Sequence, residues 1–195
     1  MRPAKRVTET YLRRVAAWYL ERYEASTGRL RRVLESRVRR SALAHGTDPL
    51  EAQPWIDAIV SDLTDTGLVD DARFAEALLR RLEARGVAAA RWRGELRARG
   101  VSAATIDAVL AASATMAAEA DVDPRRVAAA RHARRRGFGP WVRRPVDDAT
   151  LRKHAMSLMR AGHAPDAVRA VLDPRNASAA RSWADGHPEE DACPG

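Results

Sequence analysis

Apolar residues recur at helical spacing along most of the chain. In one stretch after another, an apolar side chain is followed by others three, four or seven positions later, which is the spacing of one face of an α-helix. These stripes begin at Leu12, Leu30, Ile56, Phe74, Trp92, Ile106, Leu151 and Val168. No stretch combines sustained two-residue alternation with β-branched residues. The pattern therefore predicts helices throughout and no sheet.

Residues that start and stop helices separate the stripes. Asp48-Pro49 and Asp123-Pro124 each place a side-chain acceptor before a proline, a combination typical of helix starts. Glycines past the end of several stripes mark helix ends, where a left-handed residue is often needed. They are Gly46, Gly67, Gly86, Gly100 and Gly162. The helices are short, and because short helices are unstable alone in water, they must bury their stripes against one another.

Two segments match without gaps at an offset of 62 residues, residues 96–110 against residues 158–172. Each contains the end of one helix, a glycine turn and a short amphipathic helix. Each also follows another helix, near 70–85 in one case and near 124–136 in the other. The repeating unit is therefore expected to contain three helices. A chance match between two amphipathic helix pairs is the alternative interpretation.

Tandem units of this kind predict an all-α fold in which three-helix repeats form an elongated, curved array, each packing only on its neighbours. The last segment holds prolines, glycine and acids and little to bury except Trp183, so it is expected to be an acidic, disordered tail. We expect the first unit, with a basic N-terminal arm, over residues 1–68. The second unit is expected over 69–112, the third over 123–173 and the tail over 174–195.

Charge is strongly basic and unevenly distributed. The chain has 34 Lys and Arg against 26 Asp and Glu, a net charge of +8. Residues 47–87 hold 4 basic and 9 acidic residues, whereas residues 125–181 hold 14 basic and 4 acidic residues. A basic protein is attracted to polyanions, of which nucleic acid is the commonest. The segregation predicts binding surfaces rather than a uniformly solvated one.

The sharpest basic segment is RHARRRGFGPWVRR, residues 131–144, in which Phe138 and Trp141 lie between arginines. Guanidinium groups bind phosphate in bidentate fashion, and aromatic rings stack on bases. Gly137, Gly139 and Pro140 break the helix, so an exposed connection is expected that contacts nucleic acid or an acidic protein. The alternative is a solvated helix end whose two aromatic residues pack into the core.

Two further arginine clusters lie at 91–99 and 29–40, and for both the alternative is the solvated side of an amphipathic helix. In the first of these, Arg93 and Arg97 share a helix face beside the Trp92 and Leu96 stripe. The predicted partner- or DNA-binding residues are Arg93, Arg97, Arg131, Arg134, Arg135, Arg136, Trp141, Arg143 and Arg144.

No catalytic, cofactor or metal site is predicted. The chain lacks the GxxxxGK[ST], HExxH and GxSxG motifs and a GxGxxG after a strand, and its five histidines lack metal-ligand spacing. The single cysteine, Cys193, excludes an intrachain disulfide. Asp70-Asp71 opens a helix and is interpreted as a cap rather than a catalytic pair. Without an apolar stretch near 18 residues or a signal peptide, the chain is expected to be cytoplasmic, and we expect a monomer.

The segment GLVDDARFA, residues 67–75, resembles the G-(Y/L)-(L/I/V)-(D/N)-D-x-R-(F/Y)-A element of the RecX family. At family-like spacing it is followed by R-x-R-x-E-L-x-x-R-G-V, residues 91–101, which resembles the next element of that family. The resemblance covers roughly residues 8–173. It departs at residues 36–54, where the first unit is longer than in compact members, and after Pro174, where no family counterpart is found.

The resemblance implies a curved array of three-helix repeats that binds the RecA–DNA filament and blocks filament growth, strand exchange and ATP hydrolysis by RecA. The chain is then a non-enzymatic regulator of DNA repair, recombination and the SOS response, with weak non-specific affinity for DNA. The alternative is a general helical nucleic-acid-binding protein without a RecA partner. Against it, Gln53 and Asn176 are the only Gln and Asn, so base-reading side chains are scarce.

Overall fold

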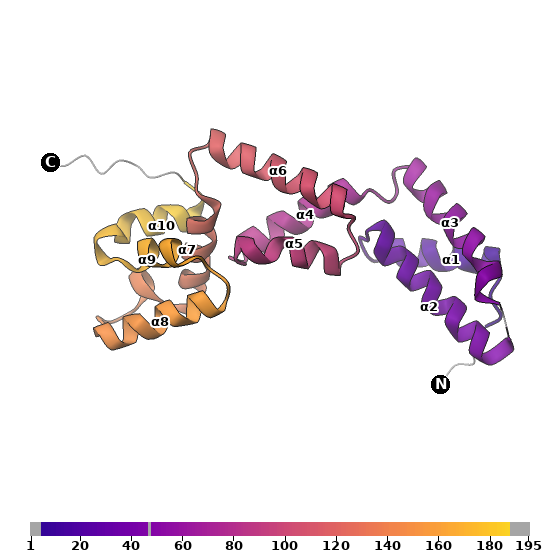
Figure 1. Ribbon diagram of the computed structural model, residues 1–195, viewed down its shortest axis with the longest axis horizontal. Coiled ribbons are helices and arrows are strands. Elements are labelled where there is room, and N and C mark those ends of the chain that lie inside the picture. Colours follow the sequence, from indigo (N-terminus) through magenta and orange to yellow (C-terminus); the bar gives the residue numbers. More distant parts are fainter. Residues whose placement is uncertain (1–4, 47, 188–195) are drawn as a thin grey trace. The chain divides into compact units, whose positions relative to one another are not determined.

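The computed structural model describes residues 5–46 and 48–187 (Figure 1), and every regular element in these ranges is a helix. The described residues form ten α-helices and two short 3-10 helices, with no strand among them. The all-α prediction is confirmed. Their contacts divide the chain into two compact units. The first holds the described residues up to Glu76 together with Leu96–Ile106, and the second holds Ala77–Glu95 and the described residues from Asp107 onward.

The first compact unit is built on α1 (Glu9–Leu20), α2 (Thr27–His45) and α3 (Pro49–Asp65). Helix α3 begins at Asp48-Pro49, as predicted. The carboxylate of Asp48 accepts from the backbone N–H of Leu50 at 2.8 Å, and Pro49 occupies the first turn. The core of this unit is formed by buried apolar side chains, of which Leu12, Leu30, Leu34, Ile56 and Ile59 are exposed by 1% or less.

The central helices are α4 (Asp71–Ala84), α5 (Ala89–Ala98) and α6 (Ala103–Glu119), and each contributes residues to both compact units. Helix α6 continues to Glu119, past the predicted end of the second unit at 112. Residues 111–119 are mostly alanine with no glycine or proline, so helix propensity extends the helix where no apolar stripe marks it. The prediction ended too early because alanine gives almost no periodic signal.

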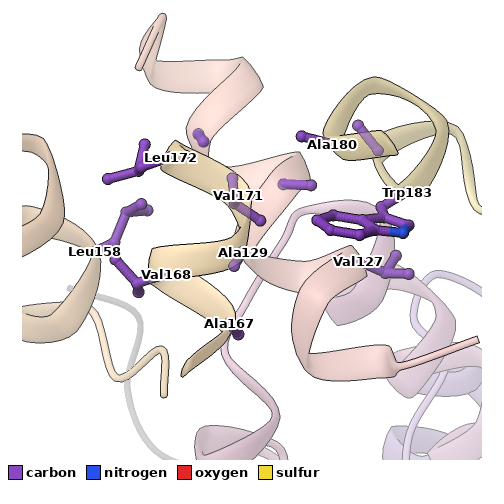
Figure 2. Close-up of a cluster of buried hydrophobic side chains, with 12 residues drawn as sticks. Val127, Ala129, Leu158, Ala167, Val168, Val171, Leu172, Ala180 and Trp183 are labelled. Carbon is purple, nitrogen blue, oxygen red and sulfur yellow. The ribbon is translucent and has the colours of Figure 1, made fainter. Parts of the chain in front are cut away.

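The second compact unit ends in α7 (Pro124–Arg136), α8 (Asp148–Arg160), α9 (Pro165–Leu172) and α10 (Ala177–Asp185), with the short 3-10 helices η1 (Gly139–Trp141) and η2 (Pro174–Asn176) between them. Their apolar faces converge on one core (Figure 2). Leu158 of α8 and Val168 and Val171 of α9 are almost fully buried there.

Helix α10 corrects the expectation of a disordered tail over residues 174–195. Ala180, Trp183 and Ala184 of this helix are 0%, 4% and 1% exposed. Figure 2 shows Trp183 facing Val127 of α7, within the same buried cluster. The three residues follow i, i+3, i+4 spacing, so a single helix turn buries all of them. The remainder of the predicted tail, residues 188–195, lies outside the described residues.

The 62-residue match corresponds to the same local structure at both positions. Helix α5 ends at Ala98 and α6 begins at Ala103, while α8 ends at Arg160 and α9 begins at Pro165. In the first turn, the N–H groups of residues 100 and 101 donate to the carbonyls of residues 97 and 96. In the second, residues 162 and 163 donate to residues 159 and 158. The helix boundaries and the turn therefore repeat together.

Candidate nucleic-acid and partner interface

Local structure divides the arginine-rich segment 131–144 into two parts. The last turn of α7 carries Arg134, Arg135 and Arg136, and the helix ends at Gly137 in the left-handed conformation (φ 66°). Basic side chains are favourable at this end because the helix dipole leaves partial negative charge on the last carbonyls. Arg143 and Arg144 follow η1, outside any helix.

Three of these arginines bind groups of the protein itself. Arg131, half-buried, donates through Nε to the carbonyl of Ala184 at 3.2 Å, and Arg134 forms an ion pair with Asp185 at 2.6 Å. Both fasten α10 to α7. Arg135 donates to the carbonyl of Arg85, just beyond the end of α4. Their charges remain, but their side chains are held by internal contacts, which sequence reasoning did not anticipate.

The other three arginines of the segment point to solvent. Arg136, Arg143 and Arg144 are exposed, and none of them has an ion-pair partner among the residues that the structure describes. The guanidinium of Arg136 lies 5.7 Å from the centre of the Phe138 ring, a cation–π contact that keeps it beside η1. An external anion can therefore bind these three arginines without breaking an ion pair among the described residues.

The two aromatic residues of the segment have packing partners. Phe138 stacks on the ring of His154, with centroids 4.2 Å apart and planes at 15°. Both Phe138 and Trp141 are half-buried against the core of the second compact unit. The structure thus favours the core-packing alternative for Phe138. Trp141, a predicted partner contact, retains a partly exposed indole, and its contact with a partner stays a prediction.

The predicted pair on α5 divides in the same way. Arg93 forms an ion pair with Asp107 of α6 at 2.6 Å, and both side chains remain about half exposed. Arg97, one turn further along α5, is exposed. In exposed pairs of this kind, solvent screens most of the attraction, so Arg93 stays available to a stronger anion.

The sequence did not reveal a histidine pair, formed by His132 of the arginine-rich segment and His163 of the turn before α9. His132 Nδ1 and His163 Nε2 lie 3.0 Å apart, and His163 is 5% exposed. Burial lowers the pKa of His132, assisted by Arg135, Arg136 and Arg91. Burial lowers the pKa of His163 to about 4, assisted by His132 and Arg91. The 62-residue match could have predicted that His163 is buried, because it aligns His163 with the buried Val101.

This histidine pair does not form part of a metal site in the described residues. Among them, no group of three or more His, Cys, Asp or Glu side chains could hold a metal ion. With depressed pKa values both imidazoles are neutral near pH 7, one donating its N–H and the other accepting. The pair therefore serves as a partly buried hydrogen bond between α7 and the turn before α9.

The carboxylates of Asp70 and Asp71 cap helices, as predicted. Asp70 accepts from the backbone N–H of Arg73 at 2.9 Å, at the start of α4. Asp71 accepts from the backbone N–H and the hydroxyl of Thr27, at 2.7 and 2.8 Å, and so also caps the start of α2. Two helix N-termini thus meet at this acidic pair, where their free N–H groups favour negative charge.

Comparison with known proteins identifies the family. A family model described as the second three-helix domain of RecX matches residues 70–110. Regulatory protein RecX of Myxococcus xanthus is 34% identical over 173 residues, which cover 88% of this chain and 89% of that protein. The chain belongs to the RecX family. Regulatory protein RecX of Halorhodospira halophila is also similar, 37% identical over 126 residues that cover 65% of this chain and 69% of that protein.

Membership of the RecX family confirms the resemblance found in the sequence. Both relatives are named regulatory proteins, so the chain belongs to a family of regulators. The matched segment 70–110 contains α4, α5 and the first part of α6, including the arginine pair of α5. In the described part of the chain, no helix is long and apolar enough to cross a membrane.

Proposed function

We propose that this RecX-family chain binds the RecA–DNA filament and inhibits the recombinase and ATPase activities of RecA, thereby modulating DNA repair, recombination and the SOS response. The observation that carries the proposal is the similarity to a regulatory protein RecX over 88% of the chain. We further propose that it acts as a monomer in the cytoplasm, by binding alone and without catalysis of its own.

The contact surface that we propose is centred on Arg136, Arg143 and Arg144. A nucleoprotein filament exposes DNA phosphate along its length, and guanidinium groups pair with phosphate and carboxylate oxygens with good geometry. Each exposed ionic contact contributes about 0.2–1 kcal/mol, so no single arginine dominates and the cluster acts as a group. Arg134 and Arg135 add positive charge while held by their internal partners.

The direct test is the DNA-stimulated ATPase of RecA, measured with increasing amounts of this chain. We expect hydrolysis to fall with a saturable dependence on the chain, and single-strand-bound RecA to be the species affected. An ATPase rate that stays constant at concentrations that saturate any binding to the filament would contradict the proposal.

Charge reversal tests the contact surface. The variant Arg136→Glu, Arg143→Glu and Arg144→Glu should inhibit at least about tenfold less well than the parent, because three attractions become repulsions. The matched control reverses three exposed arginines of the first compact unit, Arg14, Arg39 and Arg40, with the same change in net charge. Helicity by circular dichroism verifies folding. Equal losses in both variants would assign the effect to total charge instead of to this surface.

A further inference from the structure

A groove of about 440 Å³ lies in the first compact unit, away from the arginine-rich segment. Its walls are formed by the end of α1, the connection to α2, the end of α3 and the start of α4. Leu20, Leu63 and Phe74 are among its apolar lining residues, one from each of the three helices. Its size falls in the range of pockets that enclose a side chain or a small ligand.

The rim of this groove is acidic although the chain as a whole is basic. Glu21, Glu24 and Asp70 line it, against Arg73 as the one cation among its lining residues, and the neighbouring Arg22 forms an ion pair with Glu21 at 3.0 Å. The guanidinium of Arg73 donates to the carbonyl of Gly67 at 3.0 Å and is thereby held toward the turn between α3 and α4. A net negative rim repels nucleic acid and attracts cationic side chains.

Two large apolar side chains stand exposed at the same place. Leu68 is 65% and Tyr23 is 53% exposed, and both line the groove. Isolated exposed apolar residues are ordinary, but a cluster around an apolar depression marks a binding surface.

Leu68 is the large apolar residue of the segment 67–75 that stays exposed. Val69 and Ala75 are buried at 1% and 0% exposure, and the carboxylates of Asp70 and Asp71 cap helices. Leu68 lies at the same turn with its side chain in solvent. The buried and acidic residues of the segment therefore have roles in folding. The exposed Leu68 has none, which suggests a contact with another molecule.

We infer that this groove binds a basic amphipathic segment of a partner protein. An apolar side chain of the partner would lie between Leu68 and Phe74, with lysines or arginines along the acidic rim, in the manner of a helix that lays its apolar face into a groove. The inference goes beyond the proposed function, because it adds a second surface that takes a cation-rich protein segment and excludes DNA.

Segments of this chain fit the groove less well. Its own basic helix α7 turns its apolar residues, including Val127 and Ala130, into the core of its own unit. The C-terminal segment that lies outside the described residues carries Glu189, Glu190 and Asp191, which an acidic rim repels. Charge complementarity therefore favours a different protein as the occupant.

The test uses a fluorescently labelled peptide of leucine and lysine, about four helical turns long, with leucine at i, i+3, i+4 and i+7 spacing. We expect the full chain to bind it saturably in fluorescence anisotropy, and to bind neither a scrambled peptide of the same composition nor a leucine–glutamate counterpart with comparable affinity. Leu68→Ser should weaken binding at least about tenfold, because the anchor contact is lost. The matched control, Leu43→Ser on α2, changes a leucine that is 90% exposed elsewhere in the same unit, and should leave binding unchanged.

A second pair of variants tests the rim. Glu21→Lys should weaken binding of the basic peptide several-fold, whereas Glu51→Lys, the same exchange at an exposed position that does not line the groove, should not. Peptide binding that is equal in Leu68→Ser, Glu21→Lys and the parent would overturn the inference. So would sedimentation showing a parent dimer that Leu68→Ser dissociates, since a second copy would then occupy the groove. RecA inhibition, read separately, keeps the outcome distinct from that of the proposed function.

Discussion

Two glycines of the first compact unit let backbones approach more closely than any other residue would allow. A Cβ added to Gly28 of α2 would lie 2.4 Å from the carbonyl oxygen of Gly100, in the turn after α5. Polar contacts fix the same approach, because the hydroxyl of Ser26 donates to the carbonyl of Arg99 at 2.6 Å and Arg32 donates to the carbonyl of Ala98 at 3.1 Å. The neighbour of Gly28 is backbone, so it has little freedom to move.

Gly28→Ala should therefore destabilise the protein by about 1–3 kcal/mol, through the clash with backbone. Gly94→Ala is the matched control, since Gly94 is also helical and nothing lies within 4 Å of its added Cβ. There, the lower backbone entropy of alanine in the unfolded chain should stabilise by about 0.5–1 kcal/mol. Urea unfolding of both variants measures the difference. Equal stabilisation by the two exchanges would show that the glycine contact is not close.

The histidine pair makes stability depend on pH. The folded-state pKa of His163 is about 4, below the ordinary value of 6.5, and that of His132 is also lowered. The unfolded state therefore binds more protons between about pH 6.5 and pH 4, so the free energy of unfolding should fall as pH falls through this window, by up to about 3 kcal/mol. Below the folded pKa both states are protonated, and this contribution does not decrease further.

His163→Val places at this position the residue that Val101 occupies in the matching turn. We expect its free energy of unfolding to change much less between pH 6.5 and pH 4 than that of the parent. His45→Gln, an exchange at an exposed histidine at the end of α2, serves as control and should keep the parental slope. Urea titrations at three or four pH values suffice, and a His163→Val slope equal to the parental one would remove the pair as the cause.

At the scale of elements, the start or end of a helix could be predicted from the sequence wherever a capping residue marks it. Asp48-Pro49 and Asp123-Pro124 open α3 and α7 as expected, and Gly46 ends α2. Each cap works through local geometry, which the sequence contains. Helix α10 could not be predicted in this way. Its buried face is mostly alanine, and its stability depends on contacts with α7 that are remote in sequence.

The repeat also extends to a long-range contact. The carbonyl of Ala98 at the end of α5 accepts from Arg32 of α2, and that of Arg160, 62 positions later, accepts from Arg91 of α5 at 3.2 Å. In both cases an arginine near the start of one middle helix satisfies a carbonyl at the end of the next. The two matching segments therefore share a hydrogen bond to a neighbouring helix as well as a turn. The sequence match alone does not reveal this hydrogen bond.

The docking of α10 makes a measurable contribution to stability. Trp183 is 4% exposed and has the guanidinium of Arg126 5.2 Å from its ring centre. Trp183→Ala should lower the free energy of unfolding by about 3–5 kcal/mol, because it leaves a large cavity between α7 and α10. Trp18→Ala, at a tryptophan that is 49% exposed, should cost much less. Similar losses in the two variants, measured by urea unfolding, would contradict the packing of α10.

At the scale of the whole molecule, acidic and exposed basic side chains gather on different surfaces. The acidic groove belongs to the first compact unit, and the exposed arginines 136, 143 and 144 belong to the second. The sequence predicted where positive charge gathers, because residues close in sequence stay close in space. It could not predict that Arg131 and Arg134 bind α10, since their partners Ala184 and Asp185 lie some fifty residues away. Because these two arginines bind α10, the candidate contact residues of the segment are reduced to the exposed arginines.

Binding to DNA alone should depend strongly on salt concentration. If Arg136, Arg143 and Arg144 neutralise three phosphates of a single strand, the logarithm of the affinity should fall with the logarithm of salt concentration with a slope of about −2, or about 20-fold between 50 and 200 mM. Binding should be weak and independent of sequence, because guanidinium–phosphate contacts carry no base information. Anisotropy of labelled oligonucleotides of different sequence, at several salt concentrations, measures both properties.

The charge-reversed variant at these three arginines should lose most of this binding and most of its salt dependence. The control reversed at Arg14, Arg39 and Arg40 keeps the three contacts and should keep the slope, even if its affinity falls through long-range repulsion. A parent that binds one sequence selectively, or whose affinity ignores salt, would instead favour a helical nucleic-acid-binding protein that reads bases. In that case the arginines beyond α7 would serve only to position the protein on the backbone.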